Sequence, residues 1–196
     1  MRRRSRYVYP MLLFVCFFGR SVVSEAQIVF DKPKPIEPLP SPYTINTTRE
    51  QILQAVTEVL KSCQFPFNEK VERVAPIGDK LVTGPIVFAK GVNSRTDLEH
   101  YTNPLASDAR SWRAGRVSLE IVALPLDEKR SQMQIIAHFQ GLSADVSGGG
   151  ANERWIDVPS NGILEDEVMR GLAGKILGID LSVKRDGRRR ILSCEF

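Results

Sequence analysis

Two stretches decide the fold of this chain, Arg116–Leu124 (RVSLEIVAL) and Gln132–Gln140 (QMQIIAHFQ). In both, apolar residues recur at every second position, and polar residues fill most places between them. A period of two puts one side of a strand in the core and the other side in water. The polar segment Pro125–Ser131 can connect the two stretches. The pattern therefore predicts an antiparallel hairpin with one solvent-facing side.

An amphipathic helix is predicted before this hairpin, over residues 48–63, and Pro66 stops it. Its apolar face is a set at helical spacing, Ile52, Val56, Val59, Leu60 and Cys63. A capping box can start it in either of two registers, Thr47 with Glu50 or Thr48 with Gln51.

A second helix is predicted after the hairpin, beginning near Ser160 or Asn161 and ending at Gly178. Acidic residues in its first turn suit the helix dipole. Its apolar ladder is Leu164, Val168, Leu172 and Ile176. The predicted fold class is therefore α+β, an antiparallel sheet with two amphipathic helices packed on one face.

The remaining segments give weaker signals. Lys70–Ala75 and Lys80–Lys90 are predicted strands, and Pro85 makes the second an edge strand or one that carries a bulge. Gly91–Ala114 and Gly141–Arg154 are predicted to be loops, the first of them long and polar.

The first 26 residues have the layout of an export signal. A basic head, Met1–Arg6, precedes an apolar run, Tyr7–Gly19, and small residues flank Glu25 before Gln27. The alternative is a retained membrane anchor, but a spanning helix needs about 20 apolar residues and this run is shorter. We therefore predict an exported protein of the periplasm or the extracellular space.

A proline-rich segment follows the predicted cleavage site. In Asp31–Tyr43 a proline stands at nearly every second position, which favours an extended, semi-rigid spacer. The predicted organisation is a signal peptide at 1–26, a linker at 27–43 and a single α+β domain with a basic C-terminal tail at 44–196.

The charge balance argues against a nucleic-acid partner. The whole chain has 27 basic and 23 acidic residues, a net charge of +4. Residues 1–26 contain five arginines and one glutamate. Without them 22 basic and 22 acidic residues remain, so the mature chain is nearly neutral. The basic character belongs to the export segment.

Two cysteines, Cys63 and Cys194, survive the predicted cleavage. In an oxidising compartment they could form a disulfide. The alternative is a buried Cys63 and a free thiol in the tail. Sequence does not show whether the two sulfurs meet.

No motif points to catalysis, a metal or a cofactor. Ala-Asn-Glu follows Gly148–Gly150 where a phosphate-binding loop needs Lys-Ser/Thr. His100 and His138 are interpreted as surface groups, although a hydrolytic triad assembled by folding stays open. We predict that the chain is not an enzyme.

Candidate interaction residues are few. Trp112 and Trp155 can fill the core or lie at an interface, and the core interpretation is favoured for both. The basic turn Arg188, Arg189 and Arg190 can contact an acidic partner or a membrane surface, or lie free in water.

The order of these elements resembles the helix-grip domains of bacterial envelope proteins, such as the BamC-type lipoproteins. The segments that carry the resemblance are Thr48–Ser62, Asp79–Phe88, Arg116–Leu124, Gln132–Gln140 and Asn161–Leu177. The resemblance implies a non-enzymatic envelope module that contacts a partner through its sheet or through a groove between helix and sheet.

The sequence therefore predicts an exported envelope protein that acts as an interaction or scaffold module, with an envelope protein as partner. The alternative is a carrier that holds a small apolar ligand between a helix and the sheet. Such a carrier needs an apolar cavity of about 300 Å³ or more.

Overall fold

The computed structural model describes residues 37–63, 65–67, 72–74, 78–105, 110–145 and 153–181, together with Ile191. The chain divides into two units, Met1–Pro35 and Ile36–Phe196, and all described residues belong to the second. The predicted export signal, the glycine run at 148–150 and the arginines at 188–190 lie outside the described residues.

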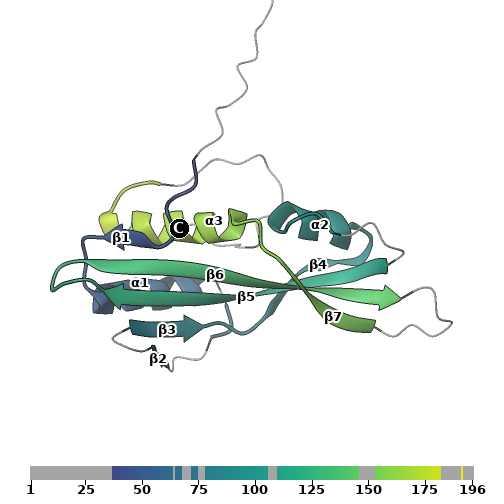
Figure 1. The fold of residues 1–196 in the computed structure, drawn as a ribbon, viewed down its shortest axis with the longest axis horizontal. Coiled ribbons are helices and arrows are strands. Elements are labelled where there is room, and N and C mark those ends of the chain that lie inside the picture. Colours follow the sequence, from purple (N-terminus) through teal and green to yellow (C-terminus); the bar gives the residue numbers. More distant parts are fainter. Residues whose placement is uncertain are drawn as a thin grey trace, which may run out of the picture. The chain divides into compact units, whose positions relative to one another are not determined.

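In the described part of the chain, strands form one antiparallel sheet around a long hairpin (Figure 1). The hairpin consists of β5 (Arg110–Pro125) and β6 (Ser131–Asp145). The outer edge of β5 pairs with β3 (Gly78–Val82) and β4 (Ile86–Lys90), and β2 (Glu72–Val74) continues the sheet beyond β3. The outer edge of β6 pairs with β1 (Tyr43–Ile45) and β7 (Glu153–Val158).

Three described helices pack against one face of this sheet. They are α1 (Arg49–Ser62), α2 (Ser94–Tyr101) and α3 (Ile163–Leu177), and a 3₁₀ turn, η1 (Gly91–Asn93), precedes α2. Figure 1 shows α3 and α2 above the hairpin, with α1 behind it. The predicted α+β class is confirmed, but a third helix joins the two that were predicted.

The core lies between α1, α3 and the inward side of the hairpin. Ile52 and Val56 of α1 and Leu164 and Leu172 of α3 are fully buried in one cluster with Leu119 of β5. Even a water-sized void beside these side chains would leave part of their surface exposed. The interface between helices and sheet is therefore closed around them.

The predicted central hairpin is confirmed, and its register explains the alternation. Val117 pairs with Phe139 and Ile121 pairs with Ile135, so the apolar positions of both strands share one face. The paired region begins at Arg110 and ends at Asp145, beyond both predicted stretches.

Three segment predictions need correction. Gly91–Ala114 contains α2, a helix that buries only Ser94, Leu98 and Tyr101 and so gives a faint apolar period. The predicted strand Lys80–Lys90 is two strands separated by Thr83, Gly84 and Pro85, and both pair with β5. The predicted loop at Gly141–Arg154 contains the end of β6 and the start of β7.

The helix boundaries depend on local backbone chemistry. Thr48 caps α1, and its capping box uses Gln51, the second of the two predicted registers. Gly162, with φ of +85°, lies directly before α3. The helix therefore begins at Ile163, two residues after the predicted start near Asn161. Gly178 ends α3 in the left-handed conformation, as predicted.

Gly141→Ala tests the packing at the distal end of the hairpin. A Cβ at Gly141 would overlap the indole ring of Trp112. We expect the substitution to lower the free energy of unfolding by about 1–3 kcal/mol, because the indole must shift within a packed layer. Urea denaturation measures this loss. Gln134→Ala, on the solvent-facing side, should change the same quantity by less than about 0.5 kcal/mol, and equal losses would contradict the account.

Candidate functional site

The outward face of the sheet is the first candidate surface. Residues that alternate with the core positions point away from the helices, because successive strand side chains point to opposite faces. Across β5, β6 and β7 this open face carries polar side chains and one tryptophan, with the apolar Val122, Ile136 and Leu142 among them. The polar residues and the tryptophan are Arg116, Ser118, Glu120, Gln134, His138, Gln140, Trp155 and Asp157. None of the three described helices covers it.

Side chains on the open face form a network across three strands. Arg116 Nε donates to Gln140 Oε1 at 2.8 Å, and Gln140 Nε2 donates to Asp157 Oδ1 at 2.7 Å. The Arg116 guanidinium also lies over the indole of Trp155, 4.1 Å from the ring centroid. Arginine and tryptophan are enriched at protein interfaces, and here they are held in a fixed arrangement at the surface.

The two histidines lie on opposite sides of the sheet. His138 Nε2 lies 3.4 Å from Glu120 Oε2 on the open face, and its side chain is 53% exposed. His100 belongs to α2 and packs edge-on against Tyr101, with the ring centroids 4.6 Å apart. The fold therefore does not bring His100 and His138 together into one site.

The two tryptophans also have different surroundings. Trp112 packs against the core on the inner face, next to Gly141, as the favoured interpretation predicts. Its Nε1 is buried and has no hydrogen-bond partner among the described residues. Trp155 lies on the open face, paired with Leu142 in register and with Arg116 through its ring. Trp112 lies in the part of β5 that precedes the predicted stretch, and Trp155 lies in β7, which was not predicted.

Cys63 is buried at the end of α1 and forms a disulfide. Cys194, its predicted partner, lies outside the described residues, so the pairing stays a prediction. Ile191, three positions before Cys194 in the chain, is partly buried and packs against the core.

A second candidate surface is a groove along the first half of α3, in which the end of the predicted linker lies. Leu39 N–H donates to Asp166 Oδ1 at 2.8 Å, and Arg170 Nη2 donates to the Glu37 carbonyl at 2.6 Å. Asp166 Oδ2 accepts from Arg170 Nε at 2.9 Å. Both side chains are nearly buried, with 5% and 11% of their surface exposed. This pair, which we call the clamp, holds the backbone of residues 37–39.

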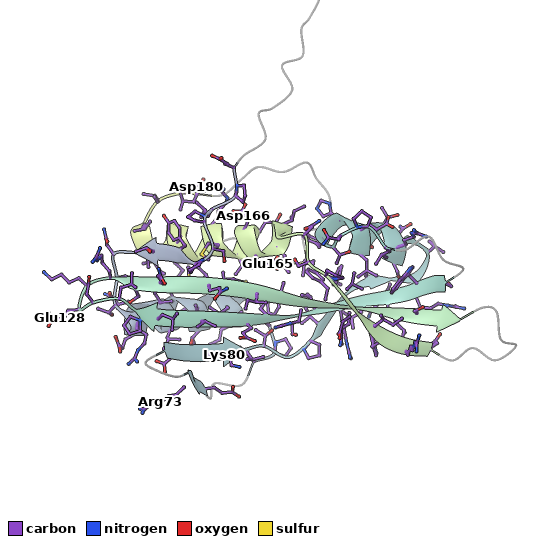
Figure 2. All side chains as sticks on the ribbon, in the orientation of Figure 1. Arg73, Lys80, Glu128, Glu165, Asp166 and Asp180 are labelled. Atoms are coloured by element: carbon purple, nitrogen blue, oxygen red, sulfur yellow. The ribbon has the colours of Figure 1, made fainter. Side chains whose placement is uncertain are left out.

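The floor of this groove is a gap in the sheet. β1 pairs with residues 131–133 of β6, and β7 pairs with residues 139–144, so no described strand covers residues 134–138 on that edge. Glu165 fills part of the gap. Its Oε1 accepts from Ala137 N–H at 3.2 Å, and its Oε2 accepts from the Ser160 hydroxyl at 2.8 Å. Figure 2 labels both Glu165 and Asp166 on α3.

The groove keeps unfilled space beside the linker segment, a partly open cavity of about 330 Å³. Its lining combines apolar side chains with the two carboxylates: Pro38, Leu39, Ser41, Ile135, Ile136, Gly162, Glu165, Asp166 and Met169. The volume is at the lower limit for small-molecule sites.

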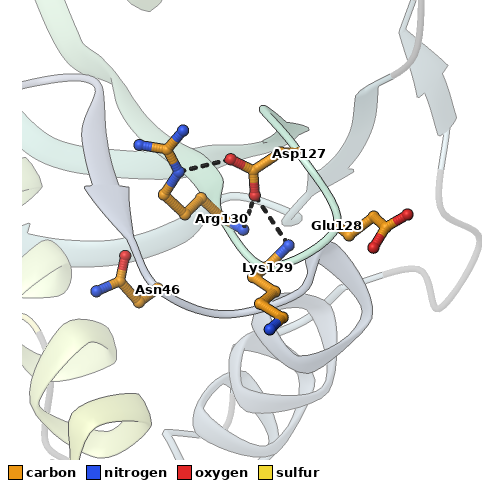
Figure 3. Close-up of a pocket in the computed structure, with 5 residues that line it drawn as sticks. All are labelled: Asn46, Asp127, Glu128, Lys129 and Arg130. Carbon is orange, nitrogen blue, oxygen red and sulfur yellow. Dashed lines mark hydrogen bonds and ion pairs between the residues drawn. The ribbon is translucent and has the colours of Figure 1, made fainter.

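A third hollow, of about 570 Å³, lies at the tip of the central hairpin and is wide open to solvent (Figure 3). Asn46 and the turn residues Asp127–Arg130 line it. Asp127 organises the turn, because its Oδ1 accepts the N–H groups of Lys129 and Arg130, and Arg130 Nε donates to its Oδ2 at 2.6 Å. The Asp127 carboxylate and the Arg130 guanidinium are thus already bonded to each other within the turn.

The described residues also contain neither a metal-binding cluster nor a membrane-spanning helix. Within these ranges no three histidine, cysteine or acidic side chains gather closely enough to hold a metal ion. No helix in the same ranges is long and apolar enough to cross a membrane.

Comparisons with protein-family models, with curated proteins and with solved structures find no match to this chain.

Sequence analysis missed the residues that build the groove. Asp166 was assigned to the favourable charge of a first helical turn, and Arg170 was not singled out. Their spacing of four is a signal for a helical ion pair. Its burial depends on the linker lying over it, which no local pattern encodes.

Asp166→Ala tests the clamp. Removing this carboxylate leaves the nearly buried Arg170 without its ion-pair partner, so we expect a loss of about 3–5 kcal/mol in the free energy of unfolding. Chemical denaturation measures it. Glu58→Ala is the matched control, because it breaks the Glu58–Lys175 ion pair between α1 and α3, which is well exposed. The control should cost far less, and a comparable loss would show that burial of the clamp is unimportant.

The turn at the hairpin tip gives a pH prediction. The N–H of Lys129, followed by the Arg130 side chain, lowers the pKa of Asp127 below its ordinary value. A lowered folded pKa means that the carboxylate stabilises the turn at neutral pH and that this contribution is lost as pH falls through the folded pKa. Carboxyl ¹³C NMR titration should show the lowered pKa. Arg130→Gln should retain most of the lowering, whereas full reversal would contradict the leading role of the backbone donor.

Proposed function

We propose that this chain is an exported protein of the bacterial cell envelope and acts as a non-enzymatic interaction module. Its partner is an envelope protein that binds the open face of the sheet, in the periplasm or outside the cell. The proposal rests on the export-signal pattern of residues 1–26, the proline-rich segment after it and the surface chemistry of β5, β6 and β7.

The observation that carries the proposal is the ordered network on the open face. Arg116, Gln140 and Asp157 are connected by hydrogen bonds, and Arg116 also contacts Trp155. Side chains held in place before binding lose less conformational entropy when a partner arrives. Such a surface offers guanidinium, amide, carboxylate and indole groups at fixed positions, a combination that suits a protein partner.

The carrier alternative has less support. It needs an apolar cavity between a helix and the sheet. Between α1 and the sheet, Ile52, Val56 and Leu119 have almost no exposed surface. The cavity of about 330 Å³ beside α3 meets the volume, but two carboxylates, Glu165 and Asp166, belong to its lining. The hydrolase alternative would have to use each histidine separately, since His100 and His138 lie on different faces.

The resemblance to helix-grip envelope domains remains part of the proposal. An antiparallel sheet with helices on one face is compatible with it. The proposal does not extend to a role in outer-membrane barrel assembly, because Val15 precedes Cys16 where a lipoprotein signal requires a small residue.

Site-specific photocrosslinking in bacterial cells tests the proposal. One variant carries a benzophenone side chain in place of His138, on the open face. The control carries it in place of Gln54, an exposed position of α1 in the helix layer. We expect one discrete adduct in the envelope fraction from position 138 and none from position 54. Adding Trp155→Ala should reduce the yield severalfold, because it removes the aromatic contact.

The outcomes separate clearly. Equal adducts from both positions would indicate unspecific capture and would contradict the assignment of the open face. Absence of any adduct at 138, in protein confirmed to be exported and folded, would overturn the proposal itself.

A further inference from the structure

The clamp recognises main chain rather than side chains. Asp166 supplies an acceptor to Leu39 N–H, and Arg170 supplies a donor to the Glu37 carbonyl. One acceptor and one donor, offered to residues two apart, are what a neighbouring β-strand offers to an extended chain. The two side chains of α3 thus act in place of a strand, at a position where the sheet has none.

The bound segment has a matching sequence. In Glu37–Pro42, prolines at 38, 40 and 42 leave only Glu37, Leu39 and Ser41 with a backbone N–H. The clamp uses the Leu39 N–H, which stands between two prolines. Proline also restricts the unbound chain to extended conformations, so binding it costs little conformational entropy. A groove with this clamp therefore favours extended, proline-flanked peptides as a class.

The resident segment does not fill the groove. About 330 Å³ stays open beside Pro38, Leu39, Ser41 and Ile136, while Ile135 and Met169, which also line it, keep only 3% of their surface exposed. A serine side chain occupies little of such a space, and a larger apolar side chain at that position would bury more surface. The groove is thus larger than its present occupant requires.

We propose that this groove is a docking site for an extended, proline-flanked peptide of a partner protein, and that residues 37–41 occupy it in cis in the resting state. We call these residues the strap. The partner peptide places a backbone N–H between two prolines on Asp166 and a bulky apolar side chain where Ser41 lies. This interaction uses a different surface from the open face and is independent of the function proposed above.

Fluorescence anisotropy with the full chain tests the proposal. The probes are a fluorescein-labelled peptide with the sequence of residues 36–43, IEPLPSPY, and its analogue IEPLPFPY. Leu39→Pro in the protein removes the N–H that holds the strap, within a context already rich in proline. Glu37→Pro is the matched control, because it keeps the Glu37 carbonyl that Arg170 uses.

We expect the Leu39→Pro protein to bind IEPLPSPY at least tenfold more tightly than the wild type or the Glu37→Pro control. IEPLPFPY should bind several times more tightly still, because phenylalanine fills the open space. IEPPPSPY, which lacks the central N–H, should not bind. Equal binding by the Leu39→Pro and wild-type proteins, or equal binding of all three peptides, would overturn the proposal.

Hydrogen exchange on the wild-type protein provides a second measurement should Leu39→Pro not fold. Excess IEPLPFPY should displace the strap and speed exchange of the Leu39 amide at least tenfold, and unchanged exchange would count against the proposal. A concentration-dependent dimer of the wild-type protein, detected by sedimentation and absent from the Leu39→Pro protein, would assign the groove to the strap of a second copy and overturn the assignment to a partner protein.

Discussion

The apolar face of the β5–β6 hairpin is the constraint on which the described fold depends. Its inward residues, such as the paired Val117 and Phe139, form one buried cluster with residues of α1 and α3. Each buried aliphatic side chain contributes about 1.5–3 kcal/mol relative to exposure, so the two helices are held mainly by this burial. A one-residue slip in pairing would turn the set outward. The hairpin register and the helix positions are therefore specified together.

The same constraint explains why one edge of the sheet is incomplete. β6 is longer than either of its outer partners, and β1 and β7 cover only its two ends. The uncovered backbone between them still needs hydrogen-bond partners. Glu165 supplies one to Ala137, and Asp166 supplies one to the neighbouring strap. Two consecutive carboxylates at the start of α3 thus accept backbone N–H groups, as the carbonyl groups of a neighbouring strand do elsewhere in the sheet.

Much of the fold was readable from sequence because its strongest elements have strong periods. The hairpin and both long helices follow from alternation or helical spacing, and Thr48, Asn161 and Gly178 mark helix ends within two residues. The short α2 was not readable, since Leu98 and Tyr101 are nearly its whole apolar face. Pro85 was interpreted as the mark of an edge strand or of a bulge, whereas it lies between two separate strands. The groove could not be predicted, because the burial of Asp166 and Arg170 arises from a segment more than 120 positions away.

The clamp also bears on what the proline-rich segment does. A spacer alone needs no contact with the domain, and a buried ion pair often adds little stability when compared with apolar packing of similar volume. Here each member of the Asp166–Arg170 pair also forms one hydrogen bond with the backbone of the strap. That arrangement fixes where the linker meets α3, on the helix layer. Residues 37–41 therefore lie away from the open face, so these residues and a partner bound to that face do not compete for the same surface.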